Sequence, residues 1–179
     1  AQRPVILAGS GVRLSGAYDE FLDLIKKLGI PVVTAWNAHD IIWDTHPLYA
    51  GRPGTVGNRA GNFTVQNSDL ILILGSRLNI RQVSYNWDSF ARNAYKIWVD
   101  IDEIEMQKPT VKVDIKICAN LSVFLPQLNK LHYSGPSSSH VKWLKWCIER
   151  REKFPIVQKS YWESKKINPY GFMQTLFRQ

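Results

Sequence analysis

The 179-residue sequence has only two cysteines and no long apolar run. Cys118 and Cys147 form no CxxC pair, so neither a disulfide framework nor a zinc site is indicated, and a reducing compartment is the default. No apolar run approaches the ~20 residues that span a bilayer, and the stretch Ala1–Pro4 has no signal-peptide profile. We therefore expect a cytoplasmic protein without a membrane partner.

The sequence also lacks the local motifs of several enzyme classes. It contains no G-x-S-x-G nucleophile elbow and no Walker loop. One loop carries His39, Asp40, Asp44 and His46, but these mix hard and soft metal ligands without a closed set, so we expect polar surface and no metal site. The first residue is Ala1 rather than Met, and we expect the chain to be a fragment of a longer protein.

The net charge of +8 raises the question of nucleic-acid binding. Many basic residues fall in the last third of the chain, where they are mixed with Glu149, Glu152 and Glu163. Mixed signs of this kind are typical of a solvated helix rather than of a groove-filling patch. We expect no nucleic-acid partner, because contact with other domains or with an anionic cofactor accounts for the charge equally well.

Short apolar runs alternate with helix-period segments over the first two-thirds of the chain. The apolar runs predict strands at residues 4–8, 31–35, 69–74, 96–102 and 113–117. Helical spacing predicts helices at residues 17–28, 57–67 and 120–128. Gly29 ends the first of these helices and Asn120 caps the last. The intervening stretch 36–56 is expected to be irregular.

Repeated strand–helix–strand units favour a parallel, doubly wound sheet. We predict an α/β domain of the Rossmann-like, NAD- or FAD-binding type over residues 1–131, followed by a Ser- and Gly-rich linker at 132–139. Residues 140–179 are expected to add a C-terminal helical extension. It comprises an amphipathic helix, on which Trp143 and Trp146 pack against a neighbour, and a last helix that Pro169 opens.

Ligands of an open parallel sheet bind beyond the carboxyl ends of its strands. The first of these ends carries Gly9-Ser10-Gly11, where the backbone can approach a phosphate at the start of the following helix. The spacing is not GxGxxG, because Leu14 replaces the third glycine, and a plain tight turn is an equally good interpretation. Asp100 ends another strand and can accept hydrogen bonds from a ribose or simply cap a loop.

Three segments at strand ends, taken in order, resemble the corresponding segments of one protein family. They are the segments 74–81 (LGSRLNIR), 99–105 (VDIDEIE) and 117–120 (ICAN). The chain resembles the central domain of thiamine diphosphate-dependent enzymes, and within them the acetolactate synthase-like group. Residues 1–131 are similar to this domain from end to end, and residues 51–57 to its glycine-rich loop before the third strand. Residues 140–179 resemble the linker helix and the start of the diphosphate-binding domain.

The resemblance implies a six-stranded sheet between two catalytic domains that lie outside this chain. In such enzymes a glutamate of the first domain activates thiamine diphosphate, and a Gly-Asp-Gly…Asn motif of the third holds it through Mg²⁺. No catalytic residue and no metal ligand is therefore expected here, and the fragment alone is expected to be inactive. The implied enzyme is a transferase or lyase that acts on a 2-keto acid such as pyruvate, as a homodimer or homotetramer.

The central domain of acetolactate synthases also binds FAD, mostly in a structural role. The resemblance implies that Arg81 lies near the mouth of the active site and that residues at the strand ends contact the cofactor. These residues are Gly9, Ser10, Gly11, Thr34, Ala35, Trp36, Asn37, Ala50, Gly51, Arg52, Pro53, Gly75, Ser76, Arg77, Leu78, Asn79, Asp100, Ile101, Asn120 and Leu121.

The sequence departs from the family at three places. Arg52-Pro53 replaces a Met-His pair, Asn79 and Ile80 replace two acids, and Asn120 replaces the acid that meets the adenine. These departures leave open a scaffold domain that binds ADP or nothing. A free-standing NAD-binding module related to sirtuin-like deacetylases is the other alternative, but the four zinc cysteines and the catalytic histidine of that class are missing.

Overall fold

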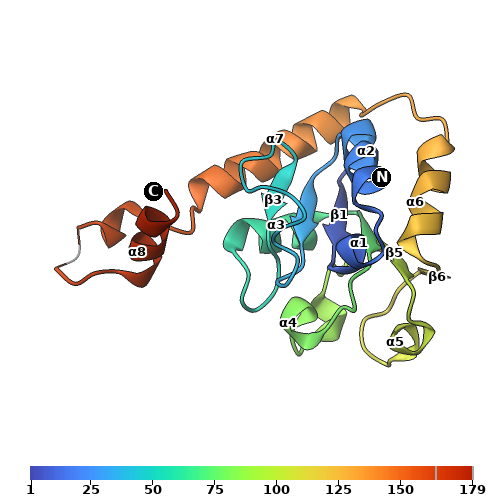
Figure 1. The fold of residues 1–179 in the computed structure, drawn as a ribbon, viewed down its shortest axis with the longest axis horizontal. Coiled ribbons are helices and arrows are strands. Elements are labelled where there is room, and N and C mark those ends of the chain that lie inside the picture. Colours follow the sequence, from blue (N-terminus) through green and yellow to red (C-terminus); the bar gives the residue numbers. More distant parts are fainter. Residues whose placement is uncertain (164, 179) are drawn as a thin grey trace.

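A six-stranded parallel sheet forms the centre of the protein, whose computed structural model describes residues 1–163 and 165–178 (Figure 1). The strand order is β3-β2-β1-β4-β5-β6, and every neighbouring pair is parallel. The strands are β1 (Pro4–Ala8), β2 (Val32–Thr34), β3 (Tyr49–Gly51), β4 (Leu70–Leu74), β5 (Tyr95–Asp100) and β6 (Ile115–Cys118). The order reverses between β1 and β4, which confirms the predicted doubly wound, Rossmann-like class.

Helices cover both faces of this sheet. The longer ones are α2 (Tyr18–Leu28), α3 (Arg59–Asn67), α6 (Leu121–Lys130), α7 (Ser138–Lys153) and α8 (Pro169–Leu176). The short ones are α1 (Gly11–Leu14), α4 (Ile80–Val83), α5 (Glu103–Gln107) and the 3₁₀ turns η1 (Trp87–Ser89) and η2 (Lys159–Tyr161). Apolar residues of α2 and α6 share one core cluster with the sheet, and those of α3 and α7 share the other. The sheet is therefore buried between two apolar cores, one on each face.

The helix-capping signals of the sequence work as predicted. Gly29 follows α2 in the left-handed conformation, with φ of 60°. The side chains of Asn120 and Asn168 accept backbone hydrogen bonds at the starts of α6 and α8, and Pro169 occupies the first turn of α8. Trp143 is buried against the sheet, and its indole N–H donates to the Pro4 carbonyl at 2.9 Å. Local signals thus determine where these helices begin and end.

The prediction that residues 36–56 are irregular is wrong in one respect, because this stretch contains the edge strand β3. This strand has only three residues, all buried, so it shows no alternation that a sequence pattern could reveal. The glycine-rich segment 51–57 consequently leads into the fourth strand along the chain, not the third. Helix α7 begins at Ser138, inside the predicted linker, where the Ser137 side chain caps it.

Arg151 fixes α7 against the β3 edge of the sheet. One nitrogen of its guanidinium donates to the carbonyl oxygens of Asp44, His46 and Tyr49, at 3.1, 3.2 and 2.6 Å. Helix α7 ends soon after this contact, at Lys153, and α8 lies apart from the sheet (Figure 1). The α8 segment leaves several large apolar side chains exposed, among them Phe172 and Phe177.

Candidate functional site

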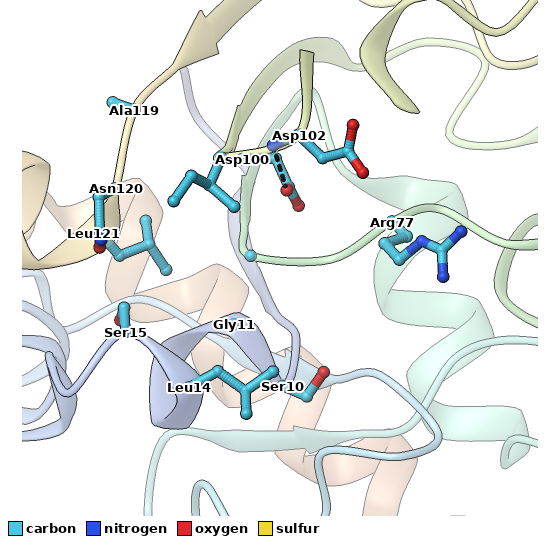
Figure 2. A pocket seen from close by; sticks show the side chains of 12 residues that line it. Ser10, Gly11, Leu14, Ser15, Arg77, Asp100, Asp102, Ala119, Asn120 and Leu121 are labelled. Atoms are coloured by element: carbon cyan, nitrogen blue, oxygen red, sulfur yellow. Dashed lines mark hydrogen bonds between the residues drawn. The ribbon is translucent and has the colours of Figure 1, made fainter. Parts of the chain in front are cut away.

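A cavity of about 280 Å³ opens at the carboxyl ends of β1, β4, β5 and β6, beside the point where the strand order reverses (Figure 2). Turns that follow these four strands form its walls. The structure brings together eight of the predicted contact residues there: Ser10, Gly11, Gly75, Arg77, Asp100, Ile101, Asn120 and Leu121. The prediction missed four further lining residues, which are Leu14, Ser15, Asp102 and Ala119.

The glycines after β1 pack tightly against the turn after β4. The backbone N–H of Gly9 donates to Leu74 at 2.9 Å, and that of Gly11 donates to Gly75 at 3.0 Å. A Cβ on Gly9 would lie 2.1 Å from the Gly75 carbonyl oxygen, and one on Gly11 would lie 2.6 Å from the Gly75 Cα. Two main chains therefore fill the space that these glycines leave. The N–H groups of both glycines are already bonded, so neither is available as a donor to a phosphate.

Asp100 is buried at the end of β5 and keeps one acceptor for a ligand. Its Oδ1 accepts a hydrogen bond from the backbone N–H of Asp102 at 3.2 Å, shown as the dashed line in Figure 2. Its Oδ2 has no hydrogen bond with any residue in the described part of the chain. Asp102 is itself engaged, because its Oδ1 caps α5 at the N–H of Glu105, 3.1 Å away. Asp100 thus combines the loop-capping role with a free carboxylate oxygen, which suits a ribose hydroxyl.

Asn120 and two leucines surround the opposite side of the opening (Figure 2). Asn120 Oδ1 accepts hydrogen bonds from the backbone N–H and the hydroxyl of Ser122, both at 3.0 Å. Because Oδ1 is engaged in this way, the amide nitrogen of Asn120 is the group left to bind a ligand, as a hydrogen-bond donor. Leu14 is 85% exposed, whereas Leu121 is buried at the base of the cavity. An apolar wall beside an amide donor and a carboxylate acceptor is the combination typical of small-molecule pockets, and it is compatible with a nucleoside.

Arg77 points away from the centre of the cavity (Figure 2). Its guanidinium lies 2.5 Å from Glu105, which also pairs with Lys108 at 2.5 Å. Hydrogen bonds from Arg77 and then Lys108 lower the pKa of Glu105 to about 2, and the same contact with Glu105 raises the pKa of Arg77. Arg77 is therefore a rim charge, held by an acid and accessible to an anion at the edge of the cavity.

The remaining predicted contact residues do not line this cavity. Asn37 adjoins the cavity, because its amide donates to Ser10 Oγ at 3.4 Å, and the Trp36 ring lies 5.5 Å from the Arg81 guanidinium carbon. Asn79 caps α4. Arg52 and Pro53 line two other cavities. The others are buried and do not line this cavity: Gly9, Thr34, Ala35, Ala50, Gly51, Ser76 and Leu78.

No cluster of three or more His, Cys, Asp or Glu that could hold a metal ion occurs among residues 1–163 and 165–178. Over the same residues, no helix has both the length and the apolar character required to cross a bilayer.

Residues 1–128 match the family model described as the thiamine pyrophosphate enzyme, central domain. A probable acetolactate synthase large subunit of Methanococcus aeolicus is 39% identical over 130 residues, which is 73% of this chain and 21% of that protein. The acetolactate synthase large subunit of Lactococcus lactis is 35% identical over 87% of this chain and 26% of the relative. A probable large subunit of Methanocaldococcus jannaschii is 32% identical over 98% of this chain and 29% of the relative. The chain thus spans about a quarter of the length of these relatives.

Proposed function

The chain belongs to the family of thiamine pyrophosphate enzyme central domains, of the acetolactate synthase-like kind, and from this premise we propose that it holds FAD or a related nucleotide. The observation that carries the proposal is the cavity at the carboxyl ends of β1, β4, β5 and β6. A switch point in strand order is where doubly wound sheets bind nucleotides.

The residues present fit the nucleoside end of such a cofactor. Asp100 offers a carboxylate oxygen to a ribose, the Asn120 amide can donate to a base, and Leu121 supplies an apolar floor. The volume of about 280 Å³ is close to the lower end of ligand pockets, ~300 Å³. We infer that the rest of a flavin dinucleotide would leave the cavity past Asn37 and Trp36, toward parts of the enzyme outside this chain.

The parent enzyme is proposed to be a transferase or lyase that decarboxylates a 2-keto acid such as pyruvate and passes the product carbanion equivalent to an acceptor. Thiamine diphosphate, held through Mg²⁺ by other domains, would supply the electron sink for this chemistry. The residues of this chain would bind and orient the second cofactor and hold the outer domains in place. The fragment alone is accordingly proposed to be inactive, and the assembled enzyme to be a cytoplasmic homodimer or homotetramer.

The test uses the full-length enzyme with a charge placed in the cavity. Leu14→Glu puts a carboxylate at an exposed position on the cavity wall, where it would repel a diphosphate without disturbing the core. Leu131→Glu is the matched control, because Leu131 is also exposed, at 62%, and lies outside the cavity. We expect the wild type and Leu131→Glu to be purified with flavin absorbance, and Leu14→Glu to lose it.

The scaffold alternative predicts a different outcome. An enzyme that is colourless as purified, takes up no added FAD and forms product from pyruvate at full rate would refute the cofactor role. If flavin is bound but pyruvate is not decarboxylated, the cofactor proposal stands and the proposed 2-keto acid reaction does not. Equal flavin content in the Leu14→Glu and Leu131→Glu variants would show that the flavin lies elsewhere.

A further inference from the structure

A second and larger cavity lies between the loop that follows β3 and the end of α7. Its volume is about 780 Å³, and it shares no lining residue with the cavity at the carboxyl ends of the strands. Four basic residues line it, namely Arg52, Arg59, Lys153 and Lys159, against the single acid Glu152. No ion pair involves these four basic side chains in the described part of the chain. The cavity is therefore a concentration of uncompensated positive charge.

Arg52 contributes a buried hydrogen-bond donor without a partner to this cavity. Its Nε is inaccessible to solvent and has no hydrogen-bond partner among the described residues. A buried donor of a charged group that lacks an acceptor is costly, and such groups in native proteins normally mark a missing water or ion. The backbone of Arg52 is well held, because its N–H donates to Asn58 Oδ1 at 3.3 Å and its carbonyl accepts from the Asn58 N–H at 2.7 Å. The backbone of Arg52 is thus held in place, while the Nε–H of its guanidinium is left without an acceptor.

A second guanidinium is held in place at the same cavity. The Arg59 guanidinium carbon lies 4.1 Å above the centre of the Phe154 ring, so stacking orients the group while its N–H edge stays available. On the far side of the cavity, the Tyr161 and Tyr170 rings stack with their centres 6.1 Å apart. Planar guanidinium donors are well suited to phosphate oxygens, which they can bind through two parallel hydrogen bonds.

We propose that this cavity is an anion site that binds a phosphate-bearing small molecule, with Arg52 and Arg59 as the phosphate ligands. Lys153 and Lys159 add positive charge at the rim. The volume exceeds what a lone phosphate needs and is ample for a nucleotide-sized molecule. This site is separate from the proposed flavin cavity, so either proposal can fail without the other.

The experiment is a calorimetric titration of AMP into the full-length enzyme, previously saturated with FAD, thiamine diphosphate and Mg²⁺ so that the other nucleotide and diphosphate sites are filled. Adenosine serves as the uncharged control ligand. The variants are Arg52→Gln and Arg59→Gln, and Arg92→Gln is the control, because Arg92 is exposed and lies outside the cavity. We expect AMP but not adenosine to bind the wild type and Arg92→Gln. Each cavity variant should weaken AMP binding about tenfold or more, as expected for loss of a charge-assisted hydrogen bond.

Two further measurements test the proposal, namely the dependence of AMP binding on ionic strength and the affinity of a conservative variant. AMP binding should weaken as ionic strength rises, because the attraction is electrostatic. Arg52→Lys should retain part of the affinity, since it keeps the charge but loses the planar donors. Adenosine binding as tightly as AMP, or AMP affinity unchanged in both Arg52→Gln and Arg59→Gln, would overturn the proposal. If Arg52→Gln fails to fold, the AMP affinity of Arg59→Gln decides the outcome alone, because Arg59 is exposed and its substitution should leave folding intact.

Discussion

Removing the Arg151 side chain should loosen the β3 edge of the sheet. Arg151→Met keeps the length and the apolar stem but deletes the donors to the carbonyls of Asp44, His46 and Tyr49. One guanidinium nitrogen carries two protons, so about two of the three bonds count in full, and a hydrogen bond to a charged group contributes ~1.5–3 kcal/mol. Because the site is partly open to water, we expect a loss of about 2–4 kcal/mol in the free energy of unfolding.

Urea unfolding of the 179-residue chain measures this loss, with Lys145→Met as the control on the same helix, where Lys145 is exposed. The control should change the free energy of unfolding by less than about 0.5 kcal/mol, as surface substitutions usually do. Arg151→Lys should lie between the two, because one ammonium cannot reproduce the planar donor geometry. Amide exchange should also accelerate first at Ala50 and its neighbours. Stability of Arg151→Met equal to that of the control would show that packing of α7, not Arg151, holds this edge.

Three further predictions concern single residues. Gly9→Ala should lower the free energy of unfolding by more than about 2 kcal/mol in the same urea assay, because its methyl group would lie 2.1 Å from the Gly75 oxygen; an unchanged value would contradict the close packing of the two turns. Glu105 has a pKa of about 2 against its ordinary 4.5, so the stability that its carboxylate contributes is complete above pH 4.5 and declines as pH falls toward 2. Urea midpoints of Glu105→Gln should therefore fall less steeply than those of the wild type over that interval, and parallel curves would contradict the assignment. Burial raises the pKa of Cys147 to about 12, so iodoacetamide should modify the exposed Cys118 and spare Cys147 in the folded protein, as mass spectrometry of the peptides can show.

The sequence predicts most of the fold because its signals are local. Apolar runs locate five strands, and the caps at Gly29, Asn120 and Pro169 locate helix ends, since each depends on a few neighbouring residues. The strand β3 escapes detection for the opposite reason. It has three residues, and it is held by pairing with β2 and by Arg151, which lies some hundred residues further along the chain. No pattern within residues 36–56 carries that information.

The candidate site is predictable only in part, for a related reason. Residues that follow the parallel strands lie at one edge of the sheet, and the sequence predicts this. The sequence does not predict which of these residues face the cavity. Thr34 and Ser76 are strand-end residues that turn into the core, whereas Leu14 and Ser15 face the cavity because α1 is a single turn. The strand order determines which strand ends share the cavity, because it separates the ends of β2 and β3 from those of β4, β5 and β6.

The glycines of the first turn show how one sequence feature can have two physical causes. A glycine that lets a phosphate approach the backbone and a glycine that lets another main chain approach it are identical in sequence. Here Gly9 and Gly11 meet the main chain of Gly75, and their N–H groups bond to it and to Leu74. The turn therefore joins β1 to β4 at the point where the strand order reverses. The two glycines therefore contribute to a nucleotide site indirectly, because they allow the turns after β1 and β4 to pack together at the wall of the cavity.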